Sequence, residues 1–93
     1  MKIIRMPTVE GQEMVFDLEV EIEEVLVVNQ TKGEIEVQMG EGKGVVPGGC
    51  ARNFLINKDS RESARTAREI RVTPEESDEK GVEVQALRWR RIE

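Results

Sequence analysis

The sequence predicts a small α+β domain, with an antiparallel sheet of about four strands, one arginine-rich helix and a short capped helical turn. Apolar residues fall at every second position across much of residues 14–39, which is the period of strands with one buried face. From residue 51 onward the apolar spacing changes, and two capping signals mark helix starts. A chain of 93 residues is expected to form a single domain over residues 1–93, held by one core.

The chain opens with a short predicted strand over residues 2–6, which Pro7 ends. A long hairpin over residues 14–39 follows. In its first arm, apolar positions alternate with acidic ones until the alternation slips by one residue at Glu23 and Glu24. Such a slip predicts a β-bulge that bends the strand around a core. The apolar positions of this hairpin are Phe16, Leu18, Val20, Ile22, Val25, Val27, Ile35, Val37 and Met39.

A glycine-rich segment over residues 40–49 is expected to form a mobile loop, or to approach a neighbouring backbone closely. A phosphate-binding loop needs a lysine followed by serine or threonine, whereas Lys43 is followed by Gly44. The segment is therefore not predicted to hold a nucleotide. It closes an acidic, β-rich half over residues 1–50, and the half over residues 51–93 holds the predicted helix and the final strand.

The arginine-rich helix is predicted over about residues 60–71, where an aspartate or a serine caps the first turn. A Thr-Pro-Glu-Glu run then begins the short capped helical turn over residues 74–80, which Gly81 ends. The final strand slips in phase near Leu87. Its apolar positions are Val82, Val84, Leu87 and Trp89.

The composition argues against an enzyme, because the chain contains no histidine, no tyrosine and one cysteine. Histidine is the usual general base and the commonest metal ligand, so most nucleophile pairs and zinc sites are excluded. We expect no catalytic residue, no metal, no cofactor and no small-molecule substrate. Cys50 is expected to be a structural thiol, either buried or in a loop.

Compartment signals point to the inside of a cell. A lone cysteine forms no internal disulfide, and no secretory leader or membrane-spanning run is found in the sequence. The expectation is a cytoplasmic protein, or a component of a virion, with no membrane partner.

Acidic side chains gather on the first arm of the hairpin. Glu19, Glu21 and Glu23 share one strand face, and Glu34 and Glu36 would neighbour them across the hairpin. One interpretation is a solvated face that discourages aggregation. The other is a protein-interaction surface, by which a small acidic regulator would bind a basic protein.

Arginines of the second half are the candidate phosphate ligands. On the predicted helix, Arg61, Arg65 and Arg68 are spaced by four and three residues and share one face. The guanidinium donates in a fixed fork that suits phosphate. The alternative is that these arginines pair with the acidic hairpin.

A second basic group lies near the end of the chain, where Arg88 and Arg90 flank Trp89. An aromatic ring between two arginines is typical of a surface that stacks on a base or on a protein partner. The alternative is that Trp89 fills the core.

Residues 49–58, which read Gly-Cys-Ala-Arg-Asn-Phe-Leu-Ile-Asn-Lys, are similar to the Gly-Tyr-Ala-Arg-Asn-Phe-Leu-Ile-Pro-Lys run of the amino-terminal domain of bacterial ribosomal protein L9. Residues 32–35 also resemble that family's Lys-Gly-Glu-Val hairpin. The resemblance implies a three-stranded sheet with a helix that binds ribosomal RNA. The RNA-facing set that it implies is Lys32, Gly33, Gly49, Arg52, Asn53 and Lys58.

Together these patterns favour a non-enzymatic interaction module that acts as a structural subunit of a larger assembly, either a viral or phage particle or a homo-oligomer. Its expected partner is a protein or a second copy of the chain. Two alternatives remain: an RNA-binding module, and a small acidic regulator of a basic protein. The interaction residues are expected among Glu19, Glu21, Glu23, Arg88, Trp89 and Arg90, and the phosphate ligands of the alternative among Lys32, Gly33, Arg52, Asn53, Lys58, Arg61, Arg65 and Arg68.

Overall fold

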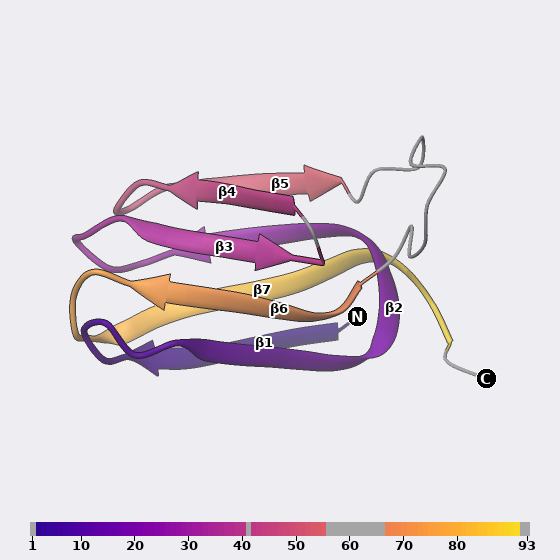
Figure 1. Ribbon diagram of the computed structural model, residues 1–93, viewed down its shortest axis with the longest axis horizontal. Helices are drawn as coiled ribbons and strands as arrows, with labels where there is room; N and C mark the ends of the chain where they lie inside the picture. Colours follow the sequence, from indigo (N-terminus) through magenta and orange to yellow (C-terminus); the bar gives the residue numbers. More distant parts are fainter. Residues whose placement is uncertain (1, 41, 56–66, 92–93) are drawn as a thin grey trace.

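The computed structural model describes residues 2–40, 42–55 and 67–91, and within them the protein is all-β. The predicted α+β class is therefore wrong, since no helix occurs in these ranges. The strands are β1 (Lys2–Thr8), β2 (Met14–Asn29), β3 (Ile35–Met39), β4 (Gly42–Val46), β5 (Ala51–Leu55), β6 (Ala67–Pro74) and β7 (Asp78–Arg90) (Figure 1).

The strands form one antiparallel sheet that folds into two facing layers. Its order is β1-β7-β2-β6-β3-β4, and β5 pairs with β2 off this path. In Figure 1 the front layer contains β4, β3, β6 and the first part of β2, and the back layer contains β5, the second part of β2, β7 and β1. One strand, β2, therefore belongs to both layers.

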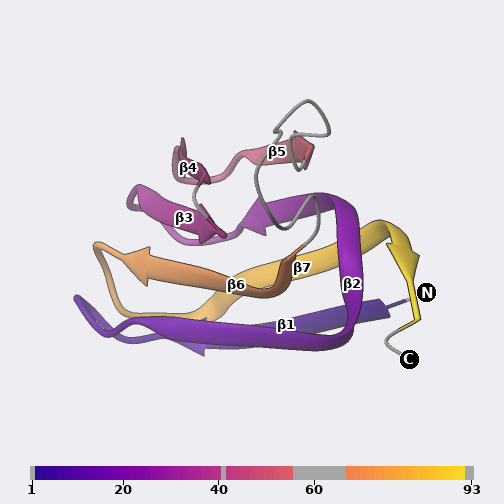
Figure 2. The same cartoon turned by 45° about the vertical axis from the view of Figure 1, so that its right-hand side comes forward.

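A bend in β2 carries the chain from the front layer to the back layer (Figure 2). At the bend, Glu19 has a φ of 59°, and its N–H donates to Oδ1 of Asp17 at 2.8 Å. The side chain of an aspartate that accepts from the backbone two residues later stabilises such a turn. The register between β2 and β6 is interrupted between Asp17 and Ile22, where the bend lies.

The predicted bulge is confirmed a few residues later in β2. The register between β2 and β7 shifts on both sides of Glu24, and the buried positions change phase from Ile22 to Val25. The slip predicted near the end of the chain is confirmed too, because Ala86 pairs with Val25 while Arg88 pairs with Glu24.

The predicted pairing of the long hairpin is wrong, because β3 pairs with β4 and β6 and not with β2. β6 lies between β2 and β3 in the front layer. The turn over residues 30–34 leads from the back layer to the front one. β2 and β3 each bury one face, so apolar residues recur at every second position in both strands. This pattern is the same whether or not the two strands are neighbours.

The predicted helices are also wrong where the structure describes them. Residues 67–74 form β6, with Ile70, Val72 and Pro74 buried. Residues 60–66, the first part of the expected arginine-rich helix, lie outside the described residues. Residues 75–77 form a bend between β6 and β7 in place of the short capped helical turn. Threonine, proline and glutamate favour turns as well as helix starts, so the capping signal was ambiguous.

Two further segments differ from expectation in part. The opening strand is confirmed but continues through Pro7 to Thr8, which an edge strand tolerates because one side needs no N–H donor. The glycine-rich segment contains the strand β4, which buries Val46 against the core. The expectation of a loop throughout residues 40–49 is wrong there.

The core lies between the two layers and is almost wholly aliphatic. Phe54 of β5, half-buried, packs against its edge. The buried apolar residues are Phe16, Leu18, Val20, Ile22, Val25, Val27, Ile35, Val37, Met39, Val46, Ile70, Val72, Val82, Val84 and Ala86. Within the described ranges, no helix is long and apolar enough to cross a membrane.

A buried asparagine holds the turns at one end of the layers. Nδ2 of Asn29 donates to the carbonyl oxygens of Gly33 at 2.8 Å and Val46 at 3.0 Å, and its Oδ1 accepts from the N–H and the hydroxyl of Thr31. Buried polar groups need such partners, because an unpaired one costs free energy. Asn29 thus ties the β2–β3 turn to the end of β4.

Candidate functional site

Charged and apolar side chains gather at the end of the layers where the bend of β2 meets the last residues of β7. Strand register brings them together, because Glu21 pairs with Arg90 and Glu24 pairs with Arg88. We call this surface the charged end. It consists of Glu21, Glu23, Glu24, Arg68, Leu87, Arg88, Trp89 and Arg90.

Glu24 lies at the centre of a polar bridge across three strands of the back layer. Its Oε1 is 3.3 Å from Nε of Arg88 on β7, and its Oε2 accepts from Nδ2 of Asn53 on β5 at 3.2 Å. The Glu24 side chain is 23% exposed and that of Arg88 is 50% exposed. The carboxylate is therefore held by two partners, and it fixes the direction of the guanidinium.

The other two arginines of the charged end also lie beside glutamates of β2. Nε of Arg90 is 3.9 Å from Oε2 of Glu23, and Nη2 of Arg68 is 3.8 Å from Oε1 of Glu21. Surface pairs of this kind contribute about 0–1 kcal/mol each to stability. Their main effect is to neutralise and orient the arginines, which is the alternative that the sequence left open.

Two apolar side chains of β7 are exposed at the same end of the layers. Trp89 and Leu87 are each 37% exposed, although they belong to a strand whose preceding residues are buried. Trp89 pairs in register with Ile22, which is fully buried. The indole therefore lies at the rim of the core rather than inside it.

A second feature lies at the side of the molecule, where β4 of the front layer faces β5 of the back layer. The ring of Phe54 packs over Gly44, and Nη1 of Arg52 donates to the Val45 carbonyl oxygen at 3.1 Å. The Arg52 guanidinium also lies 5.5 Å from the centroid of the Phe54 ring. Arg52, a phosphate ligand in the RNA-binding alternative, thus joins the two layers.

The remaining predicted residues are dispersed. Lys32 and Gly33 lie in the β2–β3 turn, at the end of the layers opposite the charged end. Glu19 lies at the bend of β2, while Glu34 and Glu36 belong to the front layer, so the acidic patch expected across the hairpin does not form. Lys58, Arg61 and Arg65 lie outside the described residues.

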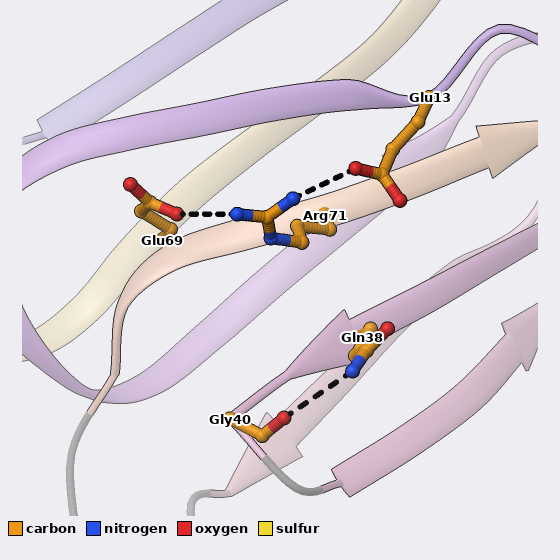
Figure 3. Close-up of polar contacts among 5 residues, drawn as sticks. All are labelled: Glu13, Gln38, Gly40, Glu69 and Arg71. Carbon is orange, nitrogen blue, oxygen red and sulfur yellow. Dashed lines mark hydrogen bonds and ion pairs between the residues drawn. The ribbon is translucent and has the colours of Figure 1, made fainter.

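The outer face of the front layer carries one more neutralised arginine (Figure 3). Arg71 of β6 lies between Glu13 and Glu69, at 2.8 Å and 3.2 Å. The hydrogen bond that Arg71 donates to Glu13, followed by the charges of both carboxylates, raises the pKa of the Arg71 guanidinium. On a neighbouring strand, Nε2 of Gln38 donates to the Gly40 carbonyl oxygen at 3.5 Å.

Sequence reasoning did not select Glu24 or Leu87 as site residues. Both lie where the strand phase slips, so their faces could not be assigned from alternation. The change of phase in the apolar pattern could have indicated these two residues, because a bulge redirects the side chains beside it.

Other chemistry is sparse in the described parts of the chain. Cys50 is exposed in the turn before β5. In the ranges 2–40, 42–55 and 67–91, no group of three His, Cys, Asp or Glu side chains could hold a metal ion. We therefore take the charged end, with its ion pairs and exposed apolar side chains, as the candidate functional site.

Comparisons of this chain with protein-family models, with curated proteins and with solved structures give no match. The resemblance of residues 49–58 to the ribosomal family stays a prediction, because nothing in these comparisons bears on it. The functional argument rests on the geometry of the chain itself.

Proposed function

We propose that this chain is a non-enzymatic interaction module that works as a structural subunit of a larger assembly, and that it docks a protein surface through the charged end. The observation that carries the proposal is the exposed Trp89 at the rim of the core, next along β7 to Arg88 and Arg90, which lie beside glutamates of β2. Tryptophan and arginine are the residues most enriched among those that dominate binding energy at protein interfaces.

The pairing of the arginines supports a protein partner over a nucleic acid. Arg68, Arg88 and Arg90 lie beside carboxylates, so a phosphate would have to approach the negative charges that already neutralise them. The net charge of −5 adds a general repulsion toward a polyanion. A protein surface with alternating charges suffers neither penalty and gains specificity from the pattern.

The composition supports the non-enzymatic part of the proposal. The chain has no histidine, and its single thiol, Cys50, is exposed in a turn. A reactive cysteine is usually activated by a neighbouring base or a helix N-terminus. Cys50 precedes the strand β5 and not a helix.

The test is the native mass of the purified chain, measured by light scattering over a range of concentrations, with titrations against structured RNA and duplex DNA at two salt concentrations. We expect a mass of more than one chain and no nucleic-acid binding with a steep salt slope. Each phosphate neutralised on a duplex contributes about −0.9 to the log–log slope. A monomer with a slope of several units would contradict the proposal and favour the RNA-binding module.

A variant pair connects the mass to the charged end. Trp89→Ser removes the exposed indole and is expected to lower the native mass. Val15→Ser is the matched control, because Val15 is 42% exposed on the outer face of the front layer. A monomeric wild-type chain that binds no nucleic acid would also contradict the proposal. That outcome would favour the alternative function, a small acidic regulator of a basic protein.

A further inference from the structure

Within the described residues the two layers have four free strand edges, and three of them carry features that hinder the addition of another strand. The edge of β1 contains Pro7, and its register with β7 shifts there. The first part of β2 carries the exposed charges of Asp17 and Glu19 and is kinked at Glu19, where φ is 59°. On β4, the Val45 carbonyl is already occupied by Arg52, and two of the five residues are glycine.

The fourth edge, β5, carries none of these features in the part of the chain that the structure describes. Its five residues contain neither proline nor glycine, and they pair with β2 in unbroken register from Ala51 to Leu55. Four of the five are exposed, and Leu55, at 65%, is the most exposed large apolar residue in the described parts of the chain. An exposed, regular edge strand is a template for strand addition.

The backbone pattern shows which groups of β5 point to the open side. The N–H of Asn29 donates to the Cys50 carbonyl at 2.9 Å, so the backbone of residue 50 faces β2. Antiparallel ladders alternate, so the groups of Arg52 and Phe54 face β2 as well. The N–H and C=O groups of Ala51, Asn53 and Leu55 then point away, and within the described residues none has a hydrogen-bond partner.

We propose that β5 is an assembly edge and that its occupant is β5 of a second copy, which runs antiparallel about a two-fold axis through Asn53. In this register, Asn53 opposes Asn53 of the partner subunit, and Ala51 opposes Leu55 of the partner subunit. Every outward N–H and C=O group of both strands gains a partner. The back layer of one copy then continues into the back layer of the other.

The side chains of β5 favour this register over one centred on Arg52. A centre at Arg52 would place two like charges opposite each other, which destabilises a strand pair. A centre at Asn53 instead places Arg52 opposite Phe54 of the partner subunit, a contact that the guanidinium already makes with the ring of its own chain at 5.5 Å. It also covers one side of the exposed Leu55 with Ala51 of the partner subunit. A strand that complements itself in this way identifies a second copy as the occupant.

This inference rests on the proposed function, because it names one contact of the proposed assembly, but it uses residues outside the charged end. The test is a charge-exchange experiment on the full chain. Ala51→Lys/Leu55→Lys places lysine opposite lysine twice across the axis, and Ala51→Glu/Leu55→Glu does the same with glutamate. Both side chains are exposed, so each variant keeps its contacts with β2 and the core.

We expect the wild-type chain to have a native mass of at least two chains. Each double variant is expected to halve that mass and to raise the dissociation constant roughly tenfold or more, because like charges oppose each other across the axis. An equimolar mixture of the lysine and glutamate variants is expected to restore the wild-type mass. Restoration also shows that both variants are folded.

Other outcomes separate this inference from the proposed function. If both double variants keep the wild-type mass while Trp89→Ser lowers it, β5 is not the interface and the assembly forms through the charged end. If the variants lose mass but their mixture does not regain it, the register about Asn53 is wrong. A wild-type chain that is monomeric at all concentrations overturns this inference together with the proposed function.

Discussion

The ring of Phe54 lies over Gly44 so closely that a Cβ at residue 44 would come within 3.0 Å of its Cζ and closer still to its Cε1. Phe54 belongs to β5 of the back layer and Gly44 to β4 of the front layer. The backbones of the two strands do not pair with each other, so this contact and the hydrogen bond from Arg52 to the Val45 carbonyl oxygen close the side of the core where the sheet is open. The glycine that suggested a loop in the sequence is therefore a packing requirement.

Gly44→Ala is expected to lower the free energy of unfolding by about 1–3 kcal/mol, because the new methyl group overpacks the site and displaces the ring. Chemical denaturation measures the change. Gly42→Ala is the matched control in the same strand, since its Cβ would meet only the Met39 carbonyl oxygen, at 3.4 Å. Equal losses in the two variants would contradict the packing role of Gly44.

Asn29→Ala is expected to destabilise the protein by about 3 kcal/mol, because it removes the amide that donates to the Val46 carbonyl and accepts from Thr31 in a buried site. Asn53→Ala is the control, since Asn53 is exposed and its amide bonds only the Glu24 carboxylate. That change is expected to cost about 0.5 kcal/mol or less. A small effect at residue 29 would mean that water replaces the amide.

Gly81→Ala is expected to cost more than about 3 kcal/mol. Gly81 has a φ of 65°, and a Cβ there would collide with the backbone of Met6 on β1. Gly11→Ala measures the cost of the positive φ alone, because Gly11 has a φ of 70° but an added Cβ would have nothing within 4 Å. It is expected to cost about 1–2 kcal/mol. Thermal unfolding should rank the two variants in that order.

The pair between Glu13 and Arg71 is expected to be insensitive to pH around neutrality. The pKa of Arg71 is raised from an already high value, so its contribution is present below the unfolded-state pKa and is lost only as pH rises through the folded-state pKa. A double-mutant cycle with Glu13→Gln and Arg71→Gln checks this. We expect equal coupling at about pH 6 and pH 9, and weaker coupling in about 1 M salt. Coupling that fell between these two pH values would contradict the assignment.

Much of the β-structure was predictable from the alternation of apolar and polar residues, but the all-β fold class was not. The first strand, the bulge near Glu24 and the slip near Leu87 all follow from periods of two. β6 was missed because Ile70 fits a three-residue spacing from Ala67 as well as the two-residue spacing to Val72. Alternation reports that a face is buried and does not identify the neighbouring strand, so the β2–β3 pairing was assigned wrongly.

The candidate surface was predictable in its composition but not in its connections. Arg88, Trp89 and Arg90 stood out as a basic and aromatic group, and the glutamates of β2 as an acidic one. Their contact depends on β7 lying next to β2, which are separated by most of the chain. Long-range strand pairing of this kind leaves no local signal in the sequence.

The shared strand β2 has a consequence for how the molecule assembles and melts. Because its two parts pair with β6 in one layer and with β7 and β5 in the other, neither layer can reach its final register until β2 is bent and placed. Most contacts in the described parts of the chain join residues that are far apart in sequence, and proteins with this topology fold slowly. Neither layer then forms a separate unfolding unit: loss of one removes half the support of the other, and the chain unfolds as a single cooperative unit.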